Sequence, residues 1–267
     1  LFGLAAWLGR RQLVGAPGTN AFVAAGVCLT LVGLPEVLGG VVWAVPIWSL
    51  MAAGLMAAAR LWDSGGVRAT SYGLQVAAVL AGTLGGAFVV PSRQPWAGLA
   101  AGAMVAVLAL GHFSWCRRQP PPRTSACFGW LDNEDRSALA VLLAGLAGAF
   151  AAGRLGLALF LDPAAADFAG VFGCSQTILV NTGAILLLVL GARRRHGELL
   201  AVGVGLALAG ALRVVALDLL RSHGLPLVAS VFSFGVVAVV GSVALGRWLQ
   251  GRGSRPAGQE ISRPPEV

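Results

Sequence analysis

The chain contains no lysine and few charged residues of any kind. All 19 of its basic residues are arginine, 11 residues are aspartate or glutamate, and charged residues make up 11% of the 267 residues. Soluble domains average about 25% charged residues. The composition therefore excludes a soluble enzyme, a disordered chain and a disulfide-rich secreted module. Hydrophobic residues reach 57% of the chain, which predicts a membrane protein with several transmembrane segments.

The sequence also lacks the motifs of metal, redox and nucleotide chemistry. Its four cysteines form no C-x-x-C pair and no cluster with histidine at metal-ligand spacing. No P-loop, HExxH or GxSxG motif occurs. The net charge of +8 is better explained by cytoplasmic loops, which collect positive charge, than by nucleic-acid binding. We expect no cofactor, no metal and no nucleic acid, and a lipid bilayer as the surroundings.

Eight apolar segments follow a short N-terminal stub, and each is about long enough to cross a bilayer as a helix. They cover residues 19–34, 39–60, 70–90, 96–115, 137–161, 174–191, 198–220 and 224–248. The first is the weakest, because it is short and closed by Pro35, and a half-helix is an alternative for it. The fold class predicted is an all-α, polytopic transmembrane helix bundle of about eight spans.

The arginines predict the orientation of these spans. If every segment crosses the membrane, 15 arginines lie on one side and only Arg93 and Arg221 on the other. Cytoplasmic loops carry the excess of positive charge, so both ends of the chain are expected in the cytoplasm. The expected location is the bacterial cytoplasmic (inner) membrane.

Composition divides the chain into five predicted parts. These are a truncated helix end and loop (1–18), a front four-span group (19–116), a cytoplasmic linker (117–136), a back four-span group (137–250) and a disordered cytoplasmic tail (251–267). The stub resembles the last half of a helix, which predicts that the sequence is a fragment. Small residues at Gly145, Ala149 and Gly153 predict close helix packing along one stripe of the fifth segment.

Residues 177–248 carry a recognisable pattern. An apolar helix ends in Gly-x-Arg-Arg-Arg, Arg213 stands five residues before Asp218, and Ser233-Phe234 lies near the start of the last helix. This pattern resembles the C-terminal region of large multi-pass bacterial membrane proteins called domain of unknown function 2339. The resemblance implies a longer protein and brings no established activity with it.

The front half follows that family's order more loosely. Pro35, Trp48 and Arg60 occur in a similar sequence. Met51 stands where the family often has glutamate, and Ser230 stands where a basic residue often precedes Ser-Phe.

The polar residues inside the back group form the one candidate site. Arg154 and Arg213 each lie about 10 Å inside the predicted outer boundary, counting 1.5 Å per residue. The predicted substrate-binding site is an anion site, for example for a lipid headgroup. Its residues are Arg154, Arg213, Asn181, Gln176 and Asp218.

A structural explanation of the same residues stays open. Each arginine can extend toward the membrane interface, and Asp218 can pair with Arg221 one turn on. Residues 19–115 have no charge in mid-span by this prediction, and His112 is expected at a span end.

Three functions are compatible with this picture. The first is a non-catalytic envelope scaffold that works with membrane-protein partners. The second is a carrier or flippase-like handler of an anionic lipid or envelope precursor, acting through the two arginines. The third, a membrane transferase on a lipid-linked substrate, has only Asp162 and Asp167 as acidic candidates in an outer loop.

Overall fold

A computed structural model describes residues 17–90, 94–119, 121, 135–165, 167–221 and 223–253. The described ranges form helices and connections and contain no β-strand, which confirms the all-α class. The stub before residue 17, most of the predicted linker and the tail from residue 254 lie outside the described residues. The predictions made for those parts stay predictions.

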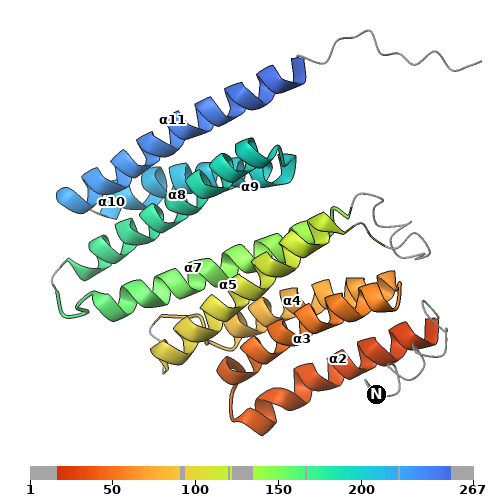
Figure 1. The fold of residues 1–267 in the computed structure, drawn as a ribbon. Helices are drawn as coiled ribbons and strands as arrows, with labels where there is room; N and C mark the ends of the chain where they lie inside the picture. Colours follow the sequence, from red (N-terminus) through yellow and green to blue (C-terminus); the bar gives the residue numbers. More distant parts are fainter. Residues whose placement is uncertain are drawn as a thin grey trace, which may run out of the picture. The chain divides into compact units, whose positions relative to one another are not determined.

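Eight long helices account for most of the described chain (Figure 1). They are α2 (Pro17–Leu38), α3 (Val41–Leu61), α4 (Gly65–Leu84), α5 (Pro95–Arg118), α7 (Ala138–Phe160), α8 (Phe168–Arg194), α9 (Gly197–Arg213) and α11 (Leu225–Gly253). A π-helical segment, η1 (Val214–Asp218), and the short α10 (Leu219–Arg221) follow α9 directly. Each predicted apolar segment therefore corresponds to one long helix, except that 198–220 comprises α9, η1 and most of α10.

Seven helices within the described residues are long and apolar enough to cross a membrane, so the chain is a multi-pass membrane protein. The exception is α4, which is 20 residues long but carries buried polar side chains along one face. Arg68, Ser71 and Gln75 lie on that face. The count of eight spans accordingly depends on α4. This helix begins five residues before the start of the predicted segment 70–90 and ends six residues before the end of that segment.

The first helix differs from its prediction as well. Pro35 does not end α2, which continues to Leu38. The turn into α3 comes after it, where Gly39 has φ of 71°, a conformation that favours glycine. The full length of 22 residues makes α2 a candidate span and not a half-helix.

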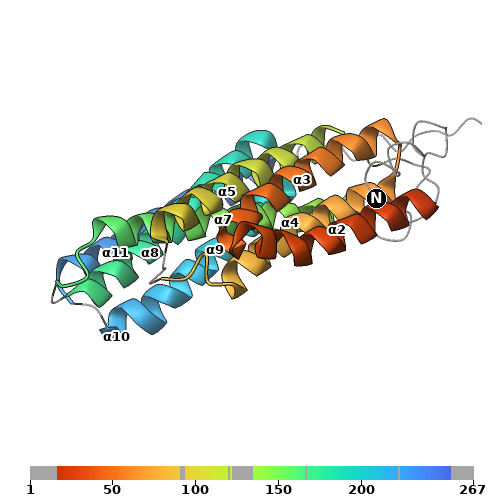
Figure 2. The same ribbon diagram turned by 90° about the horizontal axis from the view of Figure 1, so that it is seen from below.

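The helices form two compact units, residues 1–163 and 164–267. The first contains α2, α3, α4, α5 and α7, and the second contains α8, α9, η1, α10 and α11. The sequence placed the boundary at 117–136, one helix earlier. The structure differs because α7 packs against α5 and α4, which keeps it in the first unit (Figures 1 and 2).

The contact between α5 and α7 is a close backbone approach. A Cβ atom on Gly102 would lie 3.0 Å from the Ala152 nitrogen, and one on Gly148 would lie 2.8 Å from Val105 Cγ1. Gly145 of the predicted stripe also packs closely, against α5, but Ala149 is exposed. Positions three and four apart stay on one face of a 3.6-residue helix, whereas a strict four-residue step drifts away from it. The contact with α5 is therefore made by Gly148 and not by Ala149, the residue predicted from the sequence.

Inside the first unit, polar side chains join neighbouring helices. The Trp48 indole donates to the Thr30 carbonyl at 3.2 Å, which connects α3 to α2. The Gln75 amide donates to the Ser49 hydroxyl at 2.6 Å, which connects α4 to α3. Both members of the second pair are fully buried. Such bonds hold helices together where lipid offers no hydrogen-bonding alternative.

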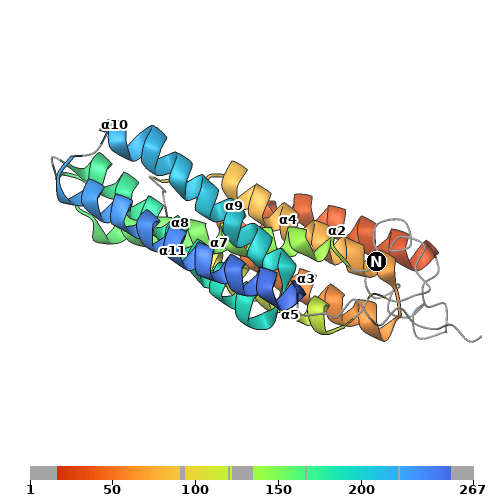
Figure 3. The same ribbon diagram turned by 90° about the horizontal axis from the view of Figure 1, so that it is seen from above.

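The second unit is built around α8, which packs against both α9 and α11 (Figures 1 and 3). A Cβ atom on Gly191 would lie 2.7 Å from the Leu200 nitrogen, and one on Gly203 would lie 3.0 Å from the Leu188 nitrogen. These two glycines bring the α8 and α9 backbones together. The buried apolar core of this unit is small and centres on Leu188 and Val237.

We predict that Gly148→Ala destabilises the protein even though alanine favours helix. The added methyl group meets Val105 and the Ala106 backbone, and overpacking costs about 1–3 kcal/mol. The matched control is Gly111→Ala on α5, where nothing lies within 4 Å of the added atom. The control is expected to be neutral or to gain up to about 1 kcal/mol. Equal melting temperatures for both variants in detergent would contradict the assigned α5–α7 contact.

Candidate functional site

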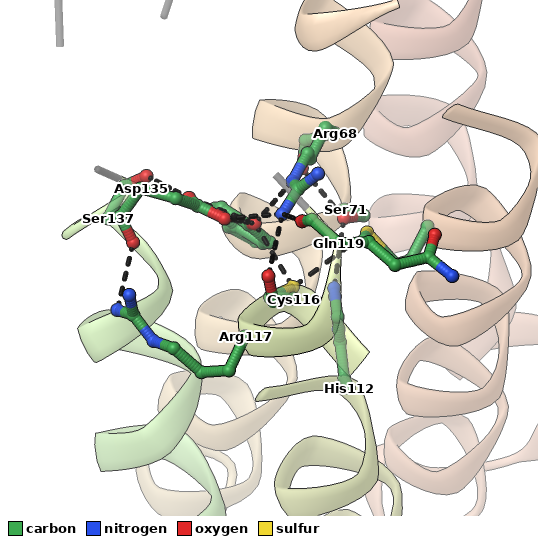
Figure 4. Close-up of polar contacts among 10 residues, drawn as sticks. Arg68, Ser71, His112, Cys116, Arg117, Gln119, Asp135 and Ser137 are labelled. Carbon is green, nitrogen blue, oxygen red and sulfur yellow. Dashed lines mark hydrogen bonds and ion pairs between the residues drawn. The ribbon is translucent and has the colours of Figure 1, made fainter. Parts of the chain in front are cut away.

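The most densely bonded polar group of the first unit surrounds Arg68 (Figure 4). We call it the Arg68 cluster. It joins α4, the C-terminal part of α5 and the residues just before α7. Its members are Arg68, Ser71, Tyr72, His112, Cys116 and Asp135, all buried.

The cluster centres on an ion pair between Arg68 and Asp135. Arg68 Nη2 lies 2.5 Å from Asp135 Oδ2, and the two side chains are only 4% and 3% exposed. The same nitrogen donates to the Cys116 carbonyl at 3.3 Å and to the Gln119 carbonyl at 2.9 Å. Arg68 Nε donates to the Tyr72 hydroxyl at 2.8 Å. A buried charge is tolerable only when it is paired and hydrogen-bonded in this way.

Asp135 is held in place by its own neighbours. Its φ of 57° lies in the left-handed region, which aspartate tolerates better than most residues. The Ser137 hydroxyl donates to its Oδ1 at 3.0 Å, and Arg117 Nη2 donates to its carbonyl at 3.1 Å (Figure 4). Arg68 thus contacts both Gln119, the first residue after α5, and Asp135, three residues before the start of α7.

The remaining members extend the cluster into the bundle. The Tyr72 hydroxyl has Asp135 Oδ2 at 2.9 Å and Cys116 Sγ at 3.1 Å as acceptors for its one hydrogen. The Ser71 hydroxyl lies 3.3 Å from His112 Nε2. The Tyr72 and His112 rings are 5.3 Å apart between centroids. His112 is therefore buried between helices, six residues before the end of α5, and its position at a membrane interface stays a prediction.

This arrangement is suited to cross-linking helices. The hydrogen bonds that Arg68 Nε and Nη2 donate, as described above, all end on groups of the protein itself, so these donors are used and Asp135 neutralises the charge. Within the described residues, no group of three His, Cys, Asp or Glu side chains is placed to hold a metal ion. The hydrogen bonds and the ion pair of the Arg68 cluster accordingly hold α4 against the residues that follow α5 and precede α7.

Sequence reasoning did not find this cluster. It placed Arg68 in a loop and Asp135 in the linker, 67 residues away. One signal was present: positions 68, 71, 72 and 75 are all polar and follow helical spacing. That spacing indicates a buried polar face on one helix, but the identity of the partner cannot be obtained from it.

In the second unit, the structure brings two of the predicted site residues together. Arg213 Nη2 donates to Gln176 Oε1 at 3.0 Å, and Arg213 Nε donates to Thr177 Oγ1 at 3.0 Å. Both acceptors are neutral. Among the described residues, no carboxylate lies within salt-bridge distance of Arg213, in contrast to Arg68. We call these three residues the Arg213 cluster.

The position of the Arg213 guanidinium tests the structural explanation given above, in which each arginine extends along its helix to the membrane interface. Arg213 is eight residues from the end of α10, about 12 Å along the helix, and Thr177 is nine residues from the start of α8, about 14 Å. The two ends belong to neighbouring antiparallel helices. The Arg213 side chain thus bonds to residues of α8 that lie at about the same distance from the helix ends, and it does not extend toward the interface.

Asn181 and Asp218 have serine partners. Asn181 is fully buried and donates to the Ser233 hydroxyl at 2.8 Å, which connects α8 to α11. Its Oδ1 has no hydrogen-bond partner among the described residues. Asp218 ends the π-helical segment and accepts a hydrogen bond from Ser230, with both side chains buried. Neither side chain hydrogen-bonds to Arg213.

The other predicted residues are placed as follows. Arg154 belongs to the first unit, and Arg213 belongs to the second, so their convergence stays a prediction. Arg154 is half-buried, and its Nε has no partner among the described residues. The side chain of Arg221 lies outside the described residues. Asp162 and Asp167 lie on the connection 161–167 between α7 and α8, shorter than the loop of about a dozen residues expected.

Comparisons with known proteins return no family model, no curated protein and no solved structure that matches this chain.

We predict that Arg68→Met lowers the stability of the protein by about 3–5 kcal/mol, because it leaves the Asp135 carboxylate buried without a partner. Unfolding in detergent measures the loss. The control is Arg60→Met, since Arg60 is exposed at the end of α3.

The double variant Arg68→Met with Asp135→Leu separates the two contributions. Replacing both charges by apolar groups removes the unpaired carboxylate, so it is expected to recover much of the lost stability. If the single and double variants unfold alike, the ion pair is not what holds this region together.

Proposed function

We propose that the chain is a bacterial cytoplasmic-membrane protein with eight spans and both ends in the cytoplasm. The seven membrane-competent helices and the arginine distribution support this topology. The eighth span is α4. It contacts α2, α3, α5 and α7, so its polar face is covered by other helices and does not need water.

Cysteine labelling in a cysteine-free background tests the topology. Asp63→Cys and Leu84→Cys lie at the two ends of α4, and Asp162→Cys and His196→Cys lie at the two ends of α8. All four positions are exposed. A membrane-impermeant reagent should label the members of each pair from opposite sides. Labelling of positions 63 and 84 from one side would leave α4 as a non-spanning helix.

We infer that the protein is a non-catalytic envelope scaffold whose second unit binds an anionic headgroup. The single observation that carries this inference is the contrast between the two arginines. Arg68 is neutralised by a carboxylate, whereas Arg213 is oriented by two neutral acceptors. A phosphate accepts charge-assisted hydrogen bonds from arginine and supplies the missing negative charge.

The second candidate function is a carrier or flippase-like handler of an anionic lipid. The depth of Arg213 favours it, because a guanidinium about 12 Å from the helix end meets a headgroup only after that headgroup has entered the bundle. Arginine in a span costs about 2.5–3.5 kcal/mol at the bilayer centre. A lipid-translocation assay in vesicles separates the two: a scaffold leaves lipid distribution unchanged, and a carrier accelerates exchange between leaflets.

We predict that Arg213→Gln loses one bound anionic lipid. Native mass spectrometry of the purified protein with added phosphatidylglycerol counts bound molecules, and phosphatidylcholine tests for charge recognition. Loss of a charge-assisted contact should weaken binding about ten- to hundredfold. Arg213→Lys keeps the charge and should keep part of the binding.

Arg60→Gln is the matched control, because it removes an exposed arginine of the other unit. Competition by inorganic phosphate without competition by lipid would identify a free anion as the ligand. Equal phosphatidylglycerol counts in wild type and Arg213→Gln would refute the anion site.

A further inference from the structure

The second unit has an apolar groove between α8 and α11, toward the end opposite to the Arg213 cluster. Its volume is about 320 Å³. Arg193 lies sixteen residues after Thr177 on α8, about 24 Å along the helix. The groove is lined by Val189, Ala192 and Arg193 of α8 and by Val239, Val240, Val243, Ala244 and Arg247 of α11.

The walls and the end of the groove differ in chemistry. Six of the eight lining residues are valine or alanine, and Val239 and Val243 are 64% and 50% exposed. The two others, Arg193 and Arg247, are exposed; Arg193 lies in the last turn of α8, and Arg247 lies six residues before the end of α11. Neither arginine has a hydrogen bond or an ion pair to a described residue. The apolar groove thus ends at two cations that have no counter-ion in the described part of the chain.

We propose that this groove binds one anionic phospholipid, with an acyl chain along α8 and α11 and the phosphate between Arg193 and Arg247. Charge complementarity selects this occupant: basic pockets between helices on the cytoplasmic side bind anionic headgroups. The assignment to the cytoplasmic leaflet rests on the proposed topology. The groove and its two arginines are independent of the Arg213 cluster.

The dimensions fit a lipid chain. The lining residues of α11 extend from Val239 to Arg247, eight residues or about 12 Å. One leaflet contributes about half of the 30 Å hydrocarbon core, so the groove covers most of the depth of an acyl chain. Trp248 follows Arg247 and packs against Gly197 at the start of α9. Tryptophan at the end of a span is typical of the headgroup level.

An apolar helix of a partner is the competing occupant, but it does not explain the arginines. An apolar partner helix would fill the groove with side chains such as valine and leucine and would leave both guanidinium groups without a negatively charged partner. A phospholipid supplies an apolar chain and an anion in one molecule. The two classes of occupant therefore differ in whether binding depends on Arg193 and Arg247.

Native mass spectrometry with phosphatidylglycerol and with phosphatidylcholine tests the proposal on the full chain. The variant Arg193→Gln with Arg247→Gln should weaken phosphatidylglycerol binding about 30-fold, because each basic residue near an anionic surface contributes about a factor of five. The matched control is Arg194→Gln, an exposed arginine on the same helix that does not line the groove. It should bind as the wild type does.

Val243→Trp tests the apolar part, because it fills the groove and leaves both charges in place. It should reduce binding of both lipids. Cross-linking of the wild-type protein is a further test. A photoactivatable phosphatidylglycerol should cross-link to residues 239–247 of α11. This result does not depend on the folding of any variant.

Three results would overturn the proposal. They are equal binding of the two lipids by the wild type, an unchanged phosphatidylglycerol count in the double variant, and the absence of cross-links to residues 239–247. Loss of binding in Arg213→Gln with retention in Arg193→Gln/Arg247→Gln would support the Arg213 site alone. The reverse would support the groove alone.

Discussion

A helix bundle in lipid must provide every hydrogen bond and counter-charge that its polar side chains need, because the hydrocarbon offers none. The Arg68–Asp135 pair shows how the first unit meets this requirement. The guanidinium is bonded to a carboxylate, a tyrosine hydroxyl and two backbone carbonyls. The pair lets α4 carry a charge inside the bundle and fixes the start of α7 beside α5.

The second unit meets the same requirement incompletely. Asn181 and Asp218 have serine partners on α11, but among the described residues Arg213 has only neutral acceptors. The π-helical segment begins directly after Arg213, and π-bulges in α-helices are frequently found at functional sites. A charge that is oriented but not neutralised is available for a ligand. The physical difference between the two arginines is thus the basis of the functional proposal.

The sequence was sufficient for the fold class, because each helix has its own apolar run of about bilayer length. It was also sufficient for the meeting of Arg213 and Gln176, since their helices are consecutive and closely connected. It was not sufficient for the Arg68 cluster. Hydropathy averages over a window and so hides a single charge, and a pairing across 67 residues depends on how α4, α5 and α7 pack. Whether Gly148 or Ala149 faces α5 likewise depends on how α7 is rotated about its axis, which the sequence does not specify.

We propose above all that the Arg213 guanidinium is oriented to bind an external anion, whereas the Arg68 guanidinium is neutralised inside the protein. An experimental structure in phosphatidylglycerol nanodiscs tests it most directly. Phosphate density is expected within hydrogen-bonding distance of the Arg213 guanidinium, with Gln176 and Thr177 still bonded to it, and no such density is expected at Arg68. An Arg213 side chain paired with a carboxylate of the protein, or extended to the headgroup region away from Gln176, would contradict it.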